Sequence, residues 1–264
     1  MPAGGGTDDS EVFVPGAGNF QYTGVDVSAL QGGSTKYTLA TIALDVSSSV
    51  EPFEATIEEL LKEVVGACQK DPNCDTLLLR VILFSTGVTE IHGFKLLSAV
   101  NPADYTGTVK TGGCTALYDA LLDASAATAT AAEQLQAQCY MVNSVTFLVT
   151  DGHPYGGTHG ASAVKTAKAD LRAKELLAGD KGILLGLADI KDLTAFEAFL
   201  KGVAANTGCE ETMVVENFSV GGPKVNKGKI ANLAGFVSKS MSTTSQALQG
   251  IGAGSTSTAV LSLT

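Results

Sequence analysis

Short apolar runs alternate with longer amphipathic stretches along most of this chain. Residues 39–44 and 77–84 are nearly continuous apolar runs of strand length, typical of strands that are buried on both faces. Residues 51–70 instead space their apolar side chains three and four positions apart, as one face of a helix requires. The same reading predicts further strands at 144–150, 182–188 and 213–215, and further helices at 115–138, 161–178, 192–206 and 226–241.

This alternation predicts the fold class and the domain organisation. Repeated strand–helix units form an α/β fold, a doubly wound and mostly parallel sheet with helices on both faces. Residues 88–94 follow the preceding strand too closely for a crossover helix, so we expect one antiparallel edge strand. We expect one domain at residues 37–242, an N-terminal arm at 1–36 that lies on the domain, and a Ser/Thr/Gly-rich tail at 243–264.

Composition narrows the class of protein. The 264 residues are 45% hydrophobic and 17% charged, enough to fill a large core. The net charge of −10 argues against nucleic acid or an anionic membrane as the partner. The chain shows neither a secretion signal nor a run of about 18 apolar residues, so we expect a cytoplasmic protein. Its cysteines lack metal-binding or redox spacing and are predicted to be free and mostly buried: Cys68, Cys74, Cys114, Cys139 and Cys209.

Polar residues gather at the ends of two predicted strands. Strand 39–44 runs into Asp45-Val46-Ser47-Ser48-Ser49, and strand 144–150 runs into Asp151-Gly152. Ligands of open parallel sheets bind beyond the carboxyl ends of the strands, where the winding reverses. If these strands are neighbours there, their loops converge with Gly112-Gly113-Cys114-Thr115, whose glycines allow close approach of the backbone.

The three segments together carry an all-oxygen set of side chains. Hydroxyl and carboxylate oxygens are the ligands that hard cations such as Mg²⁺, Mn²⁺ and Ca²⁺ prefer. An Asp-x-Ser-x-Ser pattern alone is also typical of helix caps and turns, so the prediction depends on all three segments meeting. The predicted metal ligands are Asp45, Ser47, Ser49, Thr115 and Asp151.

These motifs resemble a known family. In order and in placement they are similar to the metal-ion-dependent adhesion site of von Willebrand factor A domains, across residues 37–241. The resemblance implies a Rossmann-like fold and Mg²⁺ as the preferred ion. It implies that Ser47, Ser49 and Thr115 bind the ion directly, whereas Asp45 and Asp151 act through bound water. It further implies that a partner protein supplies an Asp or Glu as the last ligand.

Several residues beside the motifs depart from the pattern or add to it. Ser48 stands where the family often has glycine, a small change that keeps the loop tight. Cys114 directly precedes Thr115, and we interpret it as a packing residue. His153 is interpreted as a surface histidine, and the glycine-containing loop 154–160 offers Tyr155 as an anchor that helps to choose the partner.

Three functional hypotheses follow. The first is a non-enzymatic adaptor, similar to stand-alone bacterial proteins of tellurite-resistance and stress clusters or to those that work beside MoxR-type AAA+ ATPases. The second is a structural subunit that assembles through its terminal arms. The third is a metal-dependent phosphohydrolase with Asp45 as the nucleophile. The sequence opposes the third, because Ser47 stands where a second acid is needed and no phosphate-binding G-x-x-x-x-G-K-[ST] loop occurs.

Overall fold

A six-stranded sheet forms the centre of the protein. The computed structural model describes residues 11–13, 19–30, 34–188, 193–216 and 227–247. The strand order is β5-β4-β3-β6-β7-β8, and every neighbouring pair is parallel except β4 and β5. This confirms the predicted mixed sheet with one antiparallel edge strand. The strands are β3 (Lys36–Asp45), β4 (Leu77–Phe84), β5 (Val88–Leu96), β6 (Met141–Thr150), β7 (Gly179–Ala188) and β8 (Glu211–Glu216).

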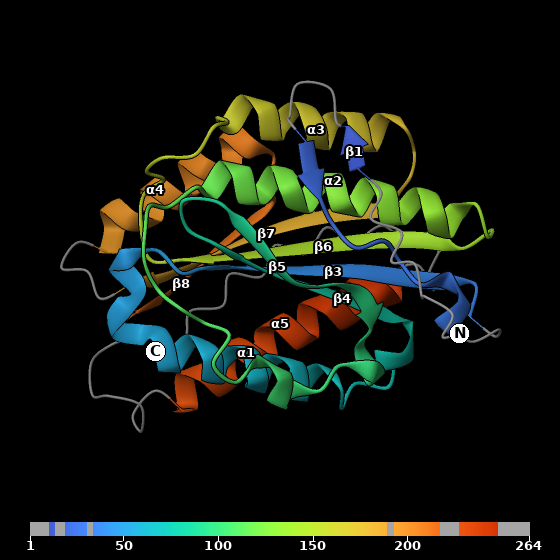
Figure 1. The fold of residues 1–264 in the computed structure, drawn as a ribbon, viewed down its shortest axis with the longest axis horizontal. Helices are drawn as coiled ribbons and strands as arrows, with labels where there is room; N and C mark the ends of the chain where they lie inside the picture. The colour runs from blue at the N-terminus through green and yellow to red at the C-terminus, as the bar shows by residue number, and fades with distance from the viewer. Residues whose placement is uncertain (1–10, 14–18, 31–33, 189–192, 217–226, 248–264) are drawn as a thin grey trace, which may run out of the picture.

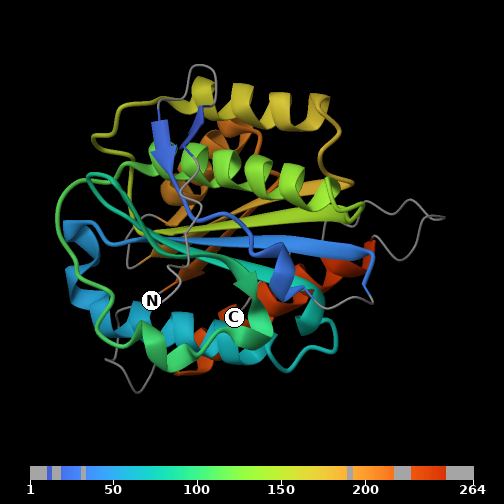
Figure 2. The ribbon, with the colours of Figure 1, turned by 45° about the vertical axis from the view of Figure 1, so that its right-hand side comes forward.

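Helices cover both faces of this sheet, as the alternating pattern predicted. Figures 1 and 2 show α1 and α5 on one face and α2, α3 and α4 on the other. Each face buries its own hydrophobic cluster against the sheet. Because the strands are covered on both sides, their sequences are continuously apolar, and every residue of β4 is buried. The helices are α1 (Glu54–Cys68), α2 (Leu117–Gln136), α3 (Ala161–Ala173), α4 (Leu193–Thr207) and α5 (Lys227–Ala247).

The winding of the sheet reverses between β3 and β6. From β3 the chain passes to β4 on one side, and after β5 it returns to place β6 on the other side. The two central strands are parallel and in register, with Leu44 opposite Val149. Their carboxyl ends therefore lie side by side, and the loops that follow these two strands begin at the same end of the sheet (Figure 1).

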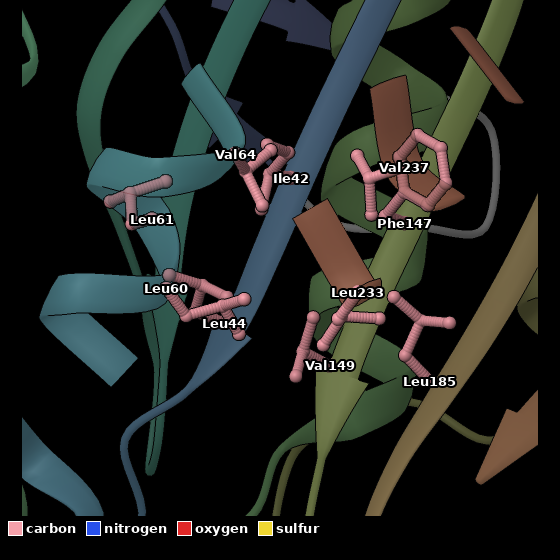
Figure 3. A pocket seen from close by; sticks show the side chains of 10 residues that line it. All are labelled: Ile42, Leu44, Leu60, Leu61, Val64, Phe147, Val149, Leu185, Leu233 and Val237. Carbon is pink, nitrogen blue, oxygen red and sulfur yellow. The ribbon is translucent and has the colours of Figure 1, made fainter. Parts of the chain in front are cut away.

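The core between the sheet and the α1/α5 layer contains a small apolar gap of about 10 Å³. Figure 3 shows that side chains of three strands and both helices surround it. A gap of this size with only apolar lining does not hold an ordered water. The lining residues are Ile42, Leu44, Leu60, Leu61, Val64, Phe147, Val149, Leu185, Leu233 and Val237.

The ends of all five helices differ from the predicted ones, and those of α3 and α5 differ most. Helix α3 ends at Ala173 rather than at 178, because Glu175 adopts a left-handed conformation (φ 53°) that turns the chain toward β7. Helix α5 continues to Ala247, beyond the predicted end at 241, and so takes in residues 243–247 of the segment predicted as a tail. The hydroxyls of Thr243 and Thr244 donate to helix carbonyls four residues earlier, which allows these residues inside a helix. Residues 248–264 lie outside the described part of the chain.

The helix predicted from residue 51 also has a different start. Its first turn is the 3-10 turn η2 (Ser48–Phe53), and the α-helix proper begins at Glu54. This tight turn follows the Asp45–Ser49 segment directly. The backbone that carries Ser48 and Ser49 is therefore already coiled into a 3-10 turn a few residues after the end of β3.

The described part of the N-terminal arm packs against the sheet and α2. Strands β1 (Glu11–Phe13) and β2 (Asn19–Gln21) form an antiparallel pair. The buried Tyr22 hydroxyl lies 2.8 Å from Thr130 Oγ1 of α2, and the Thr23 amide donates to Glu90 of β5. This segment is therefore held on the domain by polar contacts as well as by burial.

Candidate metal centre

The site starts from a buried carboxylate at the end of β3. Asp45 is 2% exposed, and both of its carboxylate oxygens accept hydrogen bonds. The Ser47 amide donates to Oδ1 at 2.8 Å, and the hydroxyl of Thr150, the last residue of β6, donates to Oδ2 at 2.6 Å. Asp45 therefore ties together the two strands at which the winding reverses. These strands are neighbours, which is the condition on which the predicted convergence of the loops depended.

Three side-chain oxygen atoms that follow Asp45 and Thr150 are linked by two short contacts. The hydroxyl oxygens of Ser47 and Ser49 lie 3.0 Å apart, and the Ser49 hydroxyl donates to Asp151 Oδ1 at 2.8 Å. Adjacent ligands of an octahedral Mg²⁺ ion, each about 2.1 Å from the metal, lie about 3.0 Å from one another. The spacing of the two serine oxygens therefore fits adjacent positions around such an ion.

The glycine segment docks directly on the serine loop. The Gly112 amide donates to Val46 O at 2.8 Å, and Gly113 O accepts from the Ser48 amide at 3.2 Å and the Ser48 hydroxyl at 3.1 Å. Gly113 has φ 84°, and a Cβ there would lie 2.5 Å from Thr86 Oγ1. Glycine is required at this position both for its conformation and for the close approach.

Thr115 follows this segment just before α2. It is 6% exposed, and its backbone exchanges two hydrogen bonds with Tyr155, of 2.7 Å and 3.0 Å. The glycine segment thus contacts the loop after β3, and Thr115 contacts the loop after β6. The structure accordingly joins the three segments on which the predicted ligands lie.

Burial controls the electrostatics of the two carboxylates. Burial raises the pKa of Asp45, and the Ser47 and Thr150 hydrogen bonds only partly oppose this rise. Burial likewise raises the pKa of Asp151, against the hydrogen bond from Ser49. Among the described residues no Lys, Arg or His forms an ion pair with either carboxylate. A bound cation would supply the positive charge that both carboxylates lack.

The donor set decides which kind of ion fits. Within the described ranges no group of three or more His, Cys, Asp and Glu side chains could hold a metal ion. A site at this edge of the sheet must therefore use hydroxyl oxygens together with its two carboxylates. Oxygen donors without sulfur or imidazole suit a hard divalent cation such as Mg²⁺, Mn²⁺ or Ca²⁺.

Two residues outside the predicted ligand set support the site. Thr150 is fully buried and orients Asp45. Asp119 of α2 is 7% exposed and accepts hydrogen bonds from the amides of Thr158 and His159 and from the His159 ring. The available signals were a polar residue ending a buried strand and an aspartate on the buried face of a helix.

His153 and the cysteines differ in how far they are exposed to solvent. His153 is exposed, as predicted, and its ring centroid lies 3.9 Å from that of Phe199. Cys114 is half-buried, and its amide donates to Thr86 Oγ1. All five cysteines are free, as predicted. The expectation that most are buried is wrong, because only Cys68 and Cys209 are buried.

Comparison with known proteins gives a likeness in fold. The sequence matches no protein-family model and no curated protein. The PilB minor pilin from Streptococcus sanguinis, as its D319A mutant, aligns at a TM-score of 0.55 with 14% identity, over 83% of this chain and 64% of the pilin. The pilus adhesin SpaC from Lactobacillus rhamnosus GG, in an open conformation, aligns at 0.51 with 13% identity, over 78% of this chain and 30% of the adhesin. At these identities the likeness concerns the fold alone.

A third solved structure is described with a metal in its own site. Proximal thread matrix protein 1 from the mussel byssus, with a zinc-occupied MIDAS motif, aligns at a TM-score of 0.46 with 18% identity, over 78% of this chain and 46% of that protein. The fold and site together define a Rossmann-like α/β protein with a cluster of oxygen donors where the winding reverses.

In the described part of the chain, no helix is both long and apolar enough to cross a bilayer.

Proposed function

We propose that this protein is a von Willebrand A-like binding module that captures an Asp or Glu side chain of a partner protein through a divalent cation, preferably Mg²⁺. The observation that carries the proposal is the 3.0 Å spacing of the Ser47 and Ser49 hydroxyls beside Asp151. Neutral hydroxyl ligands leave most of the ion's charge uncompensated. An incoming carboxylate is therefore attracted, and its bond to the ion is charge-assisted.

The residues divide between direct and indirect roles in this proposal. Ser47, Ser49 and Thr115 hold the ion directly, and Asp45 and Asp151 act through bound water. The two hydrogen bonds that already occupy Asp45, from the Ser47 amide and the Thr150 hydroxyl, support an indirect role for this carboxylate. Because the chain carries a net charge of −10, attraction of an acidic partner depends on the ion itself.

A role in binding fits the site better than a role in catalysis. A nucleophilic Asp45 would have to reach a substrate, yet this side chain is 2% exposed and both of its oxygens are hydrogen-bonded. We therefore propose that the protein is not an enzyme and that metal-dependent phosphohydrolysis is not its function.

The biological setting is a further part of the proposal. We place the protein in the cytoplasm as an adaptor of a bacterial stress response or of a MoxR-type AAA+ ATPase system. The five free thiols support a reducing compartment. Two of the proteins of similar fold are a minor pilin and a pilus adhesin, which favours the cell exterior as the competing location. Fractionation of the native host with an antibody to this chain decides between the two.

The structural-subunit hypothesis is the alternative. Tyr22 and Val25 of the arm are buried against the chain's own α2, where Val25 also donates to Gln134, so this segment is already occupied. Removing residues 248–264 leaves α5 complete and tests the tail. If this truncation abolishes assembly with the partner whereas Asp45→Ala does not, the structural role replaces metal-bridged recruitment.

The test of the proposed function is a pull-down from the native host. The baits are the wild type, the double variant Ser47→Ala/Thr115→Ala, and Ser48→Ala as the matched control, each with Mg²⁺ or with a chelator. We expect a partner that is retained by the wild type and the control only when Mg²⁺ is present. A partner retained equally by all baits in both conditions would contradict metal-bridged recruitment.

A further inference from the structure

One aromatic side chain stands directly beside a candidate metal ligand. Thr115 and Tyr155 donate to each other's carbonyl oxygens, at 2.7 Å and 3.0 Å, which makes them a directly opposed pair in an antiparallel bridge. The side chains of such a pair project to the same side, with Cβ atoms about 5 Å apart. The side chains of Tyr155 and Thr115 therefore begin next to each other on the same side of the bridge.

The two side chains of this pair differ sharply in exposure. Thr115 is 6% exposed, whereas Tyr155 is 74% exposed. Among the described residues, the other large hydrophobic side chain that is exposed is Met141, at 37%. Met141 is the first residue of β6 and so lies at the end of the sheet opposite the candidate metal site. The most exposed large aromatic ring described in this protein is thus at the rim of the metal site.

The loop that carries Tyr155 is fixed by many contacts. Gly156 and Gly157 have φ values of 82° and 87°, and a Cβ on Gly157 would lie 3.2 Å from Asp119 Oδ2. The Asp119 carboxylate also accepts hydrogen bonds from the backbone amides of Thr158 (2.8 Å) and His159 (2.9 Å). A loop held in this way loses little conformational entropy when a partner binds to it.

The two histidine rings near Tyr155 are already engaged, and the His159 ring lies 2.9 Å from Asp119 Oδ1. The centroid of His153 lies 3.9 Å from that of Phe199 on α4. Tyr155 has no comparable aromatic contact in the described structure, and its phenol combines a large apolar surface with a polar end. Rigid, exposed tyrosines of this kind are frequent anchors in protein interfaces.

We infer that Tyr155 sets the specificity of the metal site by binding an apolar side chain next to the partner's acidic residue. This inference rests on the proposed function and narrows its partner to a segment in which Asp or Glu is flanked by a large apolar residue. The ion binds the carboxylate, the Tyr155 ring packs on the flanking side chain, and Asp119 positions the loop.

Two synthetic pentapeptides test the inference. One has a central aspartate flanked by glycines, and the other has leucine on both sides of the same aspartate. Their affinities for the Mg²⁺-loaded wild type, Tyr155→Ala and Tyr155→Phe are measured by NMR titration. We expect the leucine peptide to bind the wild type and Tyr155→Phe at least about fivefold more tightly than the glycine peptide, and this preference to fall below about twofold in Tyr155→Ala.

The outcomes separate this inference from the proposed function. Equal affinity of the wild type for both peptides, or an undiminished preference in Tyr155→Ala, would overturn the role of Tyr155 and leave metal-bridged recruitment intact. Failure of the Mg²⁺-loaded wild type to bind either peptide, or binding that persists after chelation, would overturn the proposed function itself. Unchanged Mg²⁺ affinity of Tyr155→Ala, measured by calorimetry, supports a role in partner choice rather than in holding the ion.

Discussion

The Ser49 hydroxyl donates a 2.8 Å hydrogen bond to Asp151 Oδ1, across 102 positions of the chain. This bond joins the loop after β3 to the loop after β6 at the point where the winding of the sheet reverses. The same hydroxyl oxygen lies 3.0 Å from that of Ser47. Ser49 therefore joins the two halves of the candidate metal site, as does Asp45 through the hydrogen bond from Thr150.

Asp151→Asn should separate cation binding from folding. Burial raises the pKa of Asp151, which means that the carboxylate is disfavoured without a cation, and a neutral amide still accepts the Ser49 hydrogen bond. In the presence of a chelator, we expect the variant's free energy of unfolding, measured with urea, to be at least as large as that of the wild type. With Mg²⁺ present, only the wild type should gain stability. A variant that gains as much from Mg²⁺ as the wild type does would argue against a role for Asp151 in holding the ion.

Removal of the buried Thr150 hydroxyl should affect both stability and cation affinity. Thr150→Val keeps the shape of the side chain but leaves Asp45 Oδ2 without its 2.6 Å donor. We expect a loss of about 1–3 kcal/mol in the free energy of unfolding, and about tenfold weaker cation binding. Thr150→Ser, which keeps the hydroxyl, is the matched control. Equal behaviour of the two variants would show that this hydrogen bond does not orient Asp45.

The elements of the fold could be predicted from local patterns, but some of their ends could not. The spacing of Leu60, Leu61, Val64 and Val65 defines the buried face of α1 without knowledge of any distant residue. The end of α3 is different, because Leu176 continues an apolar pattern yet is buried in a cluster with the N-terminal arm. Only the tertiary structure determines that Glu175 turns the chain before it.

The site was predictable to the extent that it follows from sheet topology. Asp45 ends β3 and Asp151 directly follows β6, and the rule for open parallel sheets places such strand ends together. The hydrogen bonds of Asp119 to the amides of Thr158 and His159 span about forty positions and follow no local spacing. The exposure of Tyr155 likewise depends on this loop conformation, so its position beside Thr115 emerged only from the structure.

The buried Arg80 network should contribute strongly to stability. The Arg80 guanidinium is fully buried and pairs with Glu90 at 2.6 Å and with Asp123 at 2.8 Å. Asp123→Ala leaves this buried charge without one partner, so we expect a loss of about 3–5 kcal/mol in urea unfolding. Glu133→Ala, which breaks the exposed ion pair with Lys174, is the control and should cost less than about 1 kcal/mol. Similar losses in both variants would contradict a special role for the buried pair.

His92 should make stability depend on pH in the mildly acidic range. Burial lowers its pKa below the ordinary 6.5, and its ring nitrogens contact Gly93 O and the Tyr105 hydroxyl. As pH falls below 6.5, the unfolded chain binds a proton at His92 before the folded chain does, so stability falls. This decline amounts to at most about 1.4 kcal/mol per pH unit, and it stops below the folded pKa.

The neutral variant His92→Gln isolates this contribution. Other groups titrate in the same range, so the informative quantity is the difference in unfolding free energy between wild type and variant, measured from pH 7 down to about pH 5. We expect the advantage of the wild type to shrink as pH falls. A difference that stays constant over this range would show that burial does not shift the titration of His92.

The most direct test of the account is a calorimetric titration of Mg²⁺ or Mn²⁺ into the wild type, Ser47→Ala and Ser48→Ala. Ser47 is 1% exposed with its hydroxyl 3.0 Å from that of Ser49, whereas the exposed Ser48 hydroxyl donates to Gly113 O. We predict one site in the wild type, at least about tenfold weaker binding in Ser47→Ala, and an affinity within about twofold of the wild type in Ser48→Ala. No binding to the wild type, or equal binding to all three proteins, would contradict the account.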